Sequence, residues 1–272
     1  MTLDIAGLSL LMGAAVGVVL ALTGAGGGIL AVPLLVFGLH LRMAEAAPIG
    51  LLAVGLAAAL GALLALREGI VRYRAALMIG LTGMAVAPLG VRLSQLIPNE
   101  PVMALFALVL AWVAWRNLRQ GRRAPSPVAP PSRRLPVCAM NPTTGRLTWR
   151  APCTAMLGLT GALSGLLSGL LGVGGGFVIV PMLSEISNVP ARGVVATSMA
   201  VIALVSVGGV LGAATQGSLD WAVAAPFAAG AVLALLAGRQ FSSRWSGVRL
   251  QQAFGLLAGT VSVLMLVRAW GG

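Results

Sequence analysis

Eight runs of about 20 predominantly apolar residues constrain this chain more than any other feature. A helix of about 20 residues crosses the roughly 30 Å hydrocarbon core of a bilayer, and the runs lie at 5–22, 46–66, 75–97, 101–118, 153–170, 194–214, 219–238 and 250–267. Only 9% of the residues are charged and the mean hydropathy is +0.99, whereas soluble domains carry about 25% charged residues. The sequence therefore predicts an all-α polytopic membrane protein.

Two shorter apolar runs, at 29–41 and 177–187, each follow a cluster of glycines. They are too short for a comfortable crossing. Each set of segments therefore contains either five crossings, or three crossings and a hairpin that re-enters the membrane from one side.

The two sets of segments are copies of each other. The residues of the first glycine cluster recur 148 positions later, as do several matches far outside it. The recurring residues are Gly24, Gly26, Gly27, Gly28, Val32 and Pro33, which correspond to Gly172, Gly174, Gly175, Gly176, Val180 and Pro181. One offset without gaps indicates an internal duplication, with a first repeat at 1–118, a linker at 119–150 and a second repeat at 151–272.

The arginines predict that the two repeats have inverted topologies. Positively charged residues in short loops mark the cytoplasmic side. The loop at 67–74 carries three arginines, while its counterpart at 215–221 carries none. The next loop reverses this bias, because the first repeat has only Arg92 there and the second has Arg239, Arg244 and Arg249. Equivalent loops should thus face opposite sides, as in many secondary transporters.

The linker and its charge predict the orientation of the chain. All 18 basic residues are arginines, and the linker holds seven of them together with six prolines. We expect this segment to be cytoplasmic and to be attracted to anionic membrane lipids, with both termini periplasmic in a bacterial inner membrane. A net charge of +12 that is concentrated in loops gives no reason to expect a nucleic-acid partner. Cys138 and Cys153 should face the reducing side, so no structural disulfide is expected.

The glycine clusters are the predicted substrate site. Non-helical backbone at membrane depth is tolerated where it is buried in protein or lines a polar cavity, and a helix that begins there points its free N–H groups and positive dipole end inward. Glycine-broken short helices that meet near the midplane from opposite sides would suit a small anion. The alternative is that the glycines only allow tight helix packing, as Gly13-x-x-x-Gly17 and Gly161-x-x-x-Gly165 are expected to do. These Gly-x-x-x-Gly faces also permit close pairing of helices from different protomers, which would form a homo-oligomer.

Two copies of Gly-x-Gly-Gly-Gly, each followed by a proline, with Ala196-Thr197-Ser198 after the second copy, resemble the sulfite exporter TauE/SafE family. The resemblance covers nearly the whole chain outside the linker. It implies movement of sulfur oxyanions such as sulfite, thiosulfate or organosulfonates across bacterial inner membranes. The first repeat departs from the pattern, since Pro48-Ile49-Gly50 stands where the second has its hydroxyls.

Hydroxyl groups can donate to an oxyanion without the cost of burying a full charge, so Thr197 and Ser198 join the predicted site. Intrahelical bonding of both hydroxyls to a carbonyl one turn earlier is the alternative. Ser164, Ser168 and Thr23 are weaker candidates for the same role.

Few ionisable residues accompany this site. Glu45 and Glu185 could carry a coupling proton or could be interfacial. With one histidine and no paired carboxylates inside a span, the sequence predicts no enzyme, metal site or cofactor. We expect a secondary transporter, in the exporting direction, of small sulfur oxyanions. Transport of another small anion, or a scaffold without transport, are the alternatives.

Overall fold

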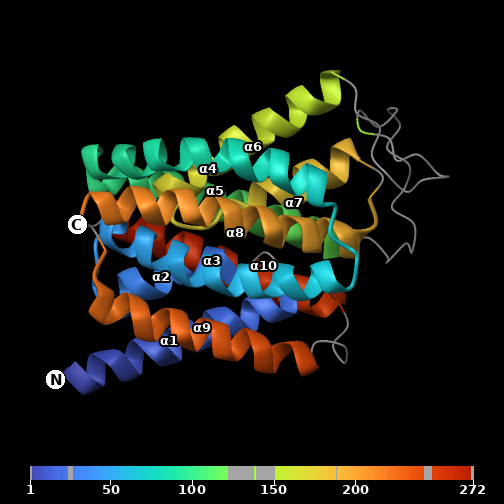
Figure 1. Ribbon diagram of the computed structural model, residues 1–272. Helices are drawn as coiled ribbons and strands as arrows, with labels where there is room; N and C mark the ends of the chain where they lie inside the picture. Colours follow the sequence, from blue (N-terminus) through green and yellow to red (C-terminus); the bar gives the residue numbers. More distant parts are fainter. Residues whose placement is uncertain are drawn as a thin grey trace.

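The computed structural model describes residues 2–23, 27–121, 138, 151–187, 189–217, 219–241 and 247–270. Apart from one isolated β-bridge between Cys138 and Ser187, the regular structure in this part of the chain is helical. The helices are α1 (Thr2–Thr23), α2 (Gly27–Gly38), α3 (Met43–Arg67), α4 (Tyr73–Leu96), α5 (Asn99–Gly121), α6 (Ala151–Leu171), α7 (Gly176–Ile186), α8 (Ala191–Thr215), α9 (Trp221–Phe241) and α10 (Gly247–Trp270). Figure 1 shows them bundled side by side.

Within the described ranges, seven helices have the length and hydropathy of membrane spans, namely α1, α3, α4, α5, α6, α8 and α9. Each coincides with a predicted span, so the prediction of an all-α polytopic membrane protein is confirmed. The two short helices predicted after the glycine clusters are also confirmed, because α2 has 12 residues and α7 has 11. Of the predicted linker, the structure describes only 119–121 and Cys138.

The Gly-x-x-x-Gly faces bring the first helix of each repeat against the fourth helix of the other repeat. Gly13 and Gly17 of α1 lie against backbone carbonyls of α9, and Gly161 and Gly165 of α6 lie against backbone carbonyls of α4. The carbonyls belong, in the same order, to Phe227, Ala231, Ile79 and Gly83. The predicted tight packing is confirmed, and the order of the contacts means that α1 runs parallel to α9 and α6 parallel to α4.

Two pairs of equivalent helices pack on each other. Helix α3 packs on α8, where Gly55 lies against Ser206 and Gly61 against Met199. Because a later residue of α3 meets an earlier residue of α8, these two helices are antiparallel. Helix α5 packs on α10, where the Ser262 hydroxyl donates to the carbonyl of Ala107 at 2.8 Å.

The bundle has two distinct ends (Figure 1). At one, which we call the linker end, α5 finishes, α6 starts and α7 finishes. There Arg116 of α5 pairs with Glu185 of α7 at 3.2 Å, and the α3–α4 turn lies against the start of α8. At the other, the terminal end, the Met43 amide at the start of α3 donates to Asn99 Oδ1 at the start of α5 at 3.0 Å.

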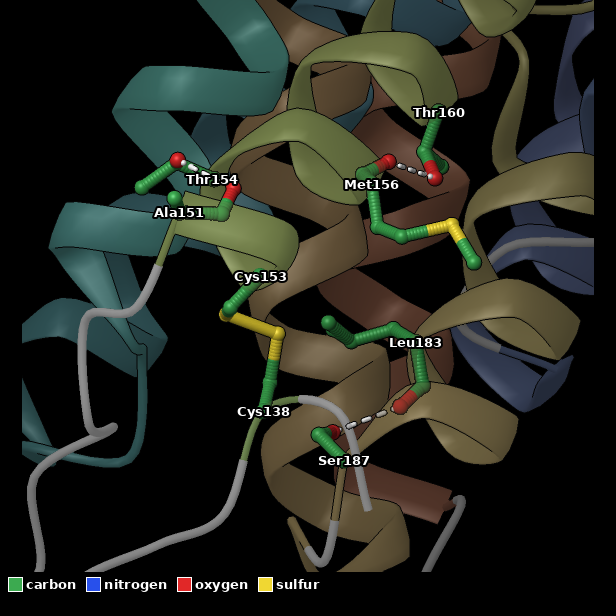
Figure 2. The surroundings of a disulfide bond; sticks show 8 residues. All are labelled: Cys138, Ala151, Cys153, Thr154, Met156, Thr160, Leu183 and Ser187. Atoms are coloured by element: carbon green, nitrogen blue, oxygen red, sulfur yellow. Dashed lines mark hydrogen bonds between the residues drawn. A yellow bond between two sulfur atoms is a disulfide. The ribbon is translucent and has the colours of Figure 1, made fainter.

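The expectation that the two cysteines would not form a disulfide was wrong. Cys138 and Cys153 are joined, with their Cα atoms 5.2 Å apart (Figure 2). The Cys138 amide also donates to the carbonyl of Ile186 at 2.9 Å. The sequence argument considered only the redox state of the compartment. Disulfide formation also requires the folded chain to bring the two cysteines together. Here Cys138 lies against the end of α7, which places its sulfur beside the first turn of α6.

Candidate substrate site

The second glycine cluster, at 172–176, forms a loop whose backbone conformation is easily adopted only by residues without a Cβ. Helix α6 ends at Leu171, and Gly172, Gly174 and Gly175 follow with φ of +73°, +77° and +69°. A left-handed backbone costs other residues roughly 1–2 kcal/mol each. The three glycines therefore reverse the chain within a few residues, and α7 begins immediately afterwards with Gly175 as its N-cap.

This loop lies halfway along the bundle. A Cβ on Gly174 would contact both Val54 and Ile202, which lie near the middle of the 25-residue helices α3 and α8. These two contact residues are also 148 positions apart. The start of α7 is consequently placed at the centre of the bundle, between equivalent residues of the two repeats.

The first glycine cluster lies against the second one at the centre of the bundle. Gly24 and Gly26 lie outside the described residues, but Gly27 and Gly28 form the start of α2. A Cβ on Gly28 would overlap the carbonyl oxygen of Val173, and one on Gly172 would overlap the backbone of Ala47 in α3. The start of α2 is thus in direct backbone contact with the loop that leads into α7. In this conformation the described glycines serve close packing, as the alternative interpretation required.

Two unpartnered hydroxyl groups lie on α6, which leads into this loop, and on α8, where Ser206 lies against Gly55 of α3. Ser168 of α6 and Ser206 of α8 are 0% and 3% exposed, and neither hydroxyl has a hydrogen-bond partner. Ser164, also fully buried, reaches the Gly175 carbonyl only at 3.5 Å. A buried hydroxyl without a partner costs about 1–3 kcal/mol, so Ser168 and Ser206 each carry this cost.

Ser206 was missed in the sequence, although a signal for it exists. The first-repeat equivalents of Ser164, Ser168 and Ser206 are Val16, Leu20 and Ala58, all aliphatic. Hydroxyls that appear in only one of two duplicated helices indicate a function that the other copy lacks. For Ser164 and Ser168, this comparison favours a stronger role than sequence alone gave them.

The structure separates Thr197 from Ser198. The Thr197 hydroxyl donates to the Gly193 carbonyl at 2.6 Å and accepts the Arg72 amide at 3.1 Å, which ties α8 to the α3–α4 turn. Ser198 lies one turn before Ile202, on the face of α8 that meets the glycine loop, and donates to the Val195 carbonyl at 2.8 Å. Both hydroxyls therefore make the intrahelical bond that was the alternative to anion binding.

The remaining candidates are Thr23, at the end of α1 next to the first glycine cluster, and the two glutamates at the ends of the bundle. The Thr23 hydroxyl donates to the Val19 carbonyl at 2.7 Å. Glu45 pairs with Arg42 at 2.7 Å at the terminal end, and Glu185 pairs with Arg116 at the linker end. The two carboxylate side chains are 39% and 65% exposed. Among the described residues, no cluster of three or more metal-ligating side chains is present.

Known proteins resemble this chain over nearly all of its length. The profile of the sulfite exporter TauE/SafE family matches residues 9–265. The chain belongs to this family. A protein of Xylella fastidiosa strain 9a5c named "Probable membrane transporter protein" is 30% identical over 262 residues, covering 95% of this chain and 94% of the relative. Another, "Probable membrane transporter protein YdhB" of Bacillus subtilis, is 25% identical over 250 residues, covering 92% and 96%.

A shorter match concerns a probable membrane transporter protein of Methanocaldococcus jannaschii, which is 47% identical over 53 residues, or 20% of each chain. No solved structure matches this TauE/SafE protein. The family resemblance read from the glycine clusters is confirmed, and the protein is a multi-pass membrane member of the family.

Proposed function

We propose that this TauE/SafE protein is a secondary transporter that exports small sulfur oxyanions, such as sulfite, thiosulfate or organosulfonates, across the bacterial inner membrane. The observation that carries the proposal is the backbone contact, halfway along the bundle, between Gly28 at the start of α2 and Val173 in the loop that leads into α7. Helix starts present N–H groups that have no partner within the helix, together with a positive dipole end. Membership of the family and the names of the relatives support transport itself.

Inverted repeats are part of the proposal, and the packing supports them. Helices α3 and α8 are equivalent in sequence and run antiparallel at Gly55–Ser206 and Gly61–Met199. The contacts of α1 with α9 recur as those of α6 with α4, at positions shifted by the same 148 residues. Inverted repeats place a substrate site near the midplane and allow access to alternate between the two sides.

The anion would bind when the two glycine hairpins move apart. They are in contact here, so separating Gly28 from Val173 opens the space between the two helix starts. Ser168 and Ser206 could then donate their unpartnered hydroxyls to an oxyanion. Donors of this kind, rather than a buried arginine, suit a substrate that must also be released.

The distribution of arginines supports a cytoplasmic linker end and periplasmic termini. Of the nine arginines whose side chains are described, six belong to segments at the linker end and three to the terminal end. The six are Arg67, Arg72, Arg74, Arg116, Arg119 and Arg192. With the positive side inside, an inside-negative potential favours outward movement of an anion by about 2.3 kcal/mol per charge and 100 mV.

Flux measurements on the purified protein in proteoliposomes test this proposal. We expect uptake of labelled sulfite, thiosulfate or a small sulfonate to exceed that of chloride and phosphate. A double variant, Ser168→Ala with Ser206→Ala, should fold normally and lose most of this flux. Chloride or phosphate transport at equal rates would favour a general anion carrier. Absence of flux for every anion would favour the scaffold instead, and full flux in the double variant would remove both serines from the site.

A further inference from the structure

The Cys138–Cys153 disulfide closes one specific place in the fold, the open end of the α6–α7 hairpin. Cys153 lies in the first turn of α6, and the Cys138 amide bonds to Ile186, the last residue of α7. A parallel bridge joins Cys138 to Ser187 as well. Figure 2 shows the disulfide beside the end of α7, where the Ser187 hydroxyl donates to the Leu183 carbonyl. One residue of the linker thus holds both helices that flank the second glycine tract.

The first hairpin has no equivalent restraint. Position 5, which corresponds to Cys153, is Ile5, and residues 1–118 contain no cysteine. The covalent bond is therefore an addition to the second repeat and is not required by the duplicated fold.

The location of the bond is unusual for a permanent disulfide. It lies at the linker end, where Arg116 and Arg119 of α5 and Arg192 of α8 also lie. The predicted linker adds six further arginines beyond Arg119 in sequence. In the proposed orientation this end faces the cytoplasm, where glutathione and thioredoxin keep thiols reduced. Disulfides that form in the cytosol of mesophiles are usually transient and catalytic or redox-sensing.

We propose that Cys138–Cys153 is a reducible latch: the disulfide restrains the α6–α7 hairpin, and its reduction releases the hairpin. A cytoplasmic dithiol of the thioredoxin class supplies the two electrons. Its thiolate attacks one cysteine sulfur, the other leaves as a thiolate and takes up a proton, and the second thiol of the reductant then resolves the mixed disulfide. The products are two free cysteines and one oxidised reductant.

Burial sets the condition for this reaction. Cys138 and Cys153 are 0% and 1% exposed, so the reductant reaches a sulfur only after Cys138 moves away from α7. Apart from the disulfide, the described contacts of Cys138 include one backbone hydrogen bond to Ile186 and the bridge to Ser187. Once the bond is reduced, Cys138, which contacts the end of α7 through backbone hydrogen bonding, is no longer joined covalently to the first turn of α6. The hairpin can then move away from Gly28 more readily.

Counting thiols in the folded, full-length protein tests the redox step without any cargo. In inverted membrane vesicles, a thioredoxin-class dithiol should expose two cysteines to a maleimide–polyethylene glycol reagent without denaturant. In intact cells, a membrane-impermeant reductant should leave the bond closed. If the bond opened only after denaturation, or only from the cell exterior, it would be a permanent staple and the latch would be refuted.

Amide hydrogen exchange and flux test the consequence. Reduction should accelerate exchange at 183–187 by about fivefold, an effect of the size of ordinary coupling between sites, and Cys138→Ser should reproduce this rate and abolish the response to reductant. Glu185→Gln, which removes the nearby ion pair but leaves the cysteines, should keep the response. Unchanged exchange on reduction would overturn the latch, whereas a response in exchange with no sulfur-anion flux would overturn only the proposed cargo.

Discussion

The two glycine hairpins, α1–α2 and α6–α7, have the same order of elements: a long helix, a glycine cluster and a short helix. They differ in the side chains that surround the glycines. In the first hairpin a Cβ on Gly27 would overlap Leu20, whereas in the second a Cβ on Gly175, the equivalent position, would overlap the Ser164 hydroxyl. The next equivalent pair is Leu20 and Ser168. At these two equivalent positions the first hairpin has aliphatic side chains and the second has hydroxyl groups. A substrate held between the hairpins would meet an apolar wall on one face and polar groups on the other.

Replacing Gly175 should give the largest effect, because two costs coincide there. Gly175→Ala places a Cβ at positive φ, which costs about 1–2 kcal/mol, and overlaps the Ser164 hydroxyl, which adds about 1–3 kcal/mol of overpacking. We expect a lowered thermal unfolding midpoint in detergent and loss of flux. Gly217→Ala is the matched control, since Gly217 has φ +65° and open space around it. Equal destabilisation of both variants would show that close packing at the second hairpin matters little.

Thr197 extends the comparison of the two repeats to a position outside the hairpins, because the equivalent residue of the first repeat is Ile49. Thr197→Val leaves the Arg72 amide without its acceptor, which should destabilise the protein by about 1–3 kcal/mol. Thr197→Ser should restore both stability and flux, since it keeps the hydroxyl. Loss of flux in Thr197→Val at unchanged unfolding midpoint would contradict this structural role and return the side chain to the substrate site.

Replacing Ser168 should lower the flux without lowering the stability of the protein. Ser168→Ala removes a buried hydroxyl without a partner, so the unfolding free energy should stay equal or rise, while flux falls about tenfold if one hydrogen bond of about 1.4 kcal/mol to the anion is lost. Thr160→Val is the control on the same helix, because the Thr160 hydroxyl is already bonded to the Met156 carbonyl at 2.7 Å. A lower unfolding free energy in Ser168→Ala, with normal flux, would mean that the hydroxyl only supports the fold.

The fold could be predicted to a large extent from the sequence because membrane spans depend on length and hydropathy. The short helices after Gly28 and Gly176, and the close packing of Gly13 and Gly161, follow from residue size at fixed spacing. The disulfide could not be predicted, since nothing in the spacing of Cys138 and Cys153 reveals that the linker returns to the end of α7.

The candidate site was predicted only in outline, for a related reason. The glycines mark where the backbone reverses, but a hydroxyl's role depends on which helix it faces. Adjacent residues of a helix point about 100° apart, so Thr197 faces the α3–α4 turn, whereas Ser198 shares a face with Ile202 and Ser206. The sequence distinguishes Ser206 from its aliphatic equivalent Ala58, but its position against Gly55 follows only from the packing of α3 on α8.

The two glutamates should give the smallest effects, and they test whether either end of the bundle supplies a coupling proton. Glu45 and Glu185 are exposed members of ion pairs with Arg42 and Arg116, and such pairs contribute about 0.2–1 kcal/mol. Glu45→Gln and Glu185→Gln should each leave the flux and its dependence on pH unchanged. In a double-mutant cycle, Arg116→Gln should cost as little as Glu185→Gln and the pair no more than either, because only the ion pair is lost. A proton-coupling glutamate behaves differently, since its amide cannot titrate. If uphill flux lost its dependence on pH in one glutamate variant but not in the matching arginine variant, proton coupling would therefore lie at that end of the bundle.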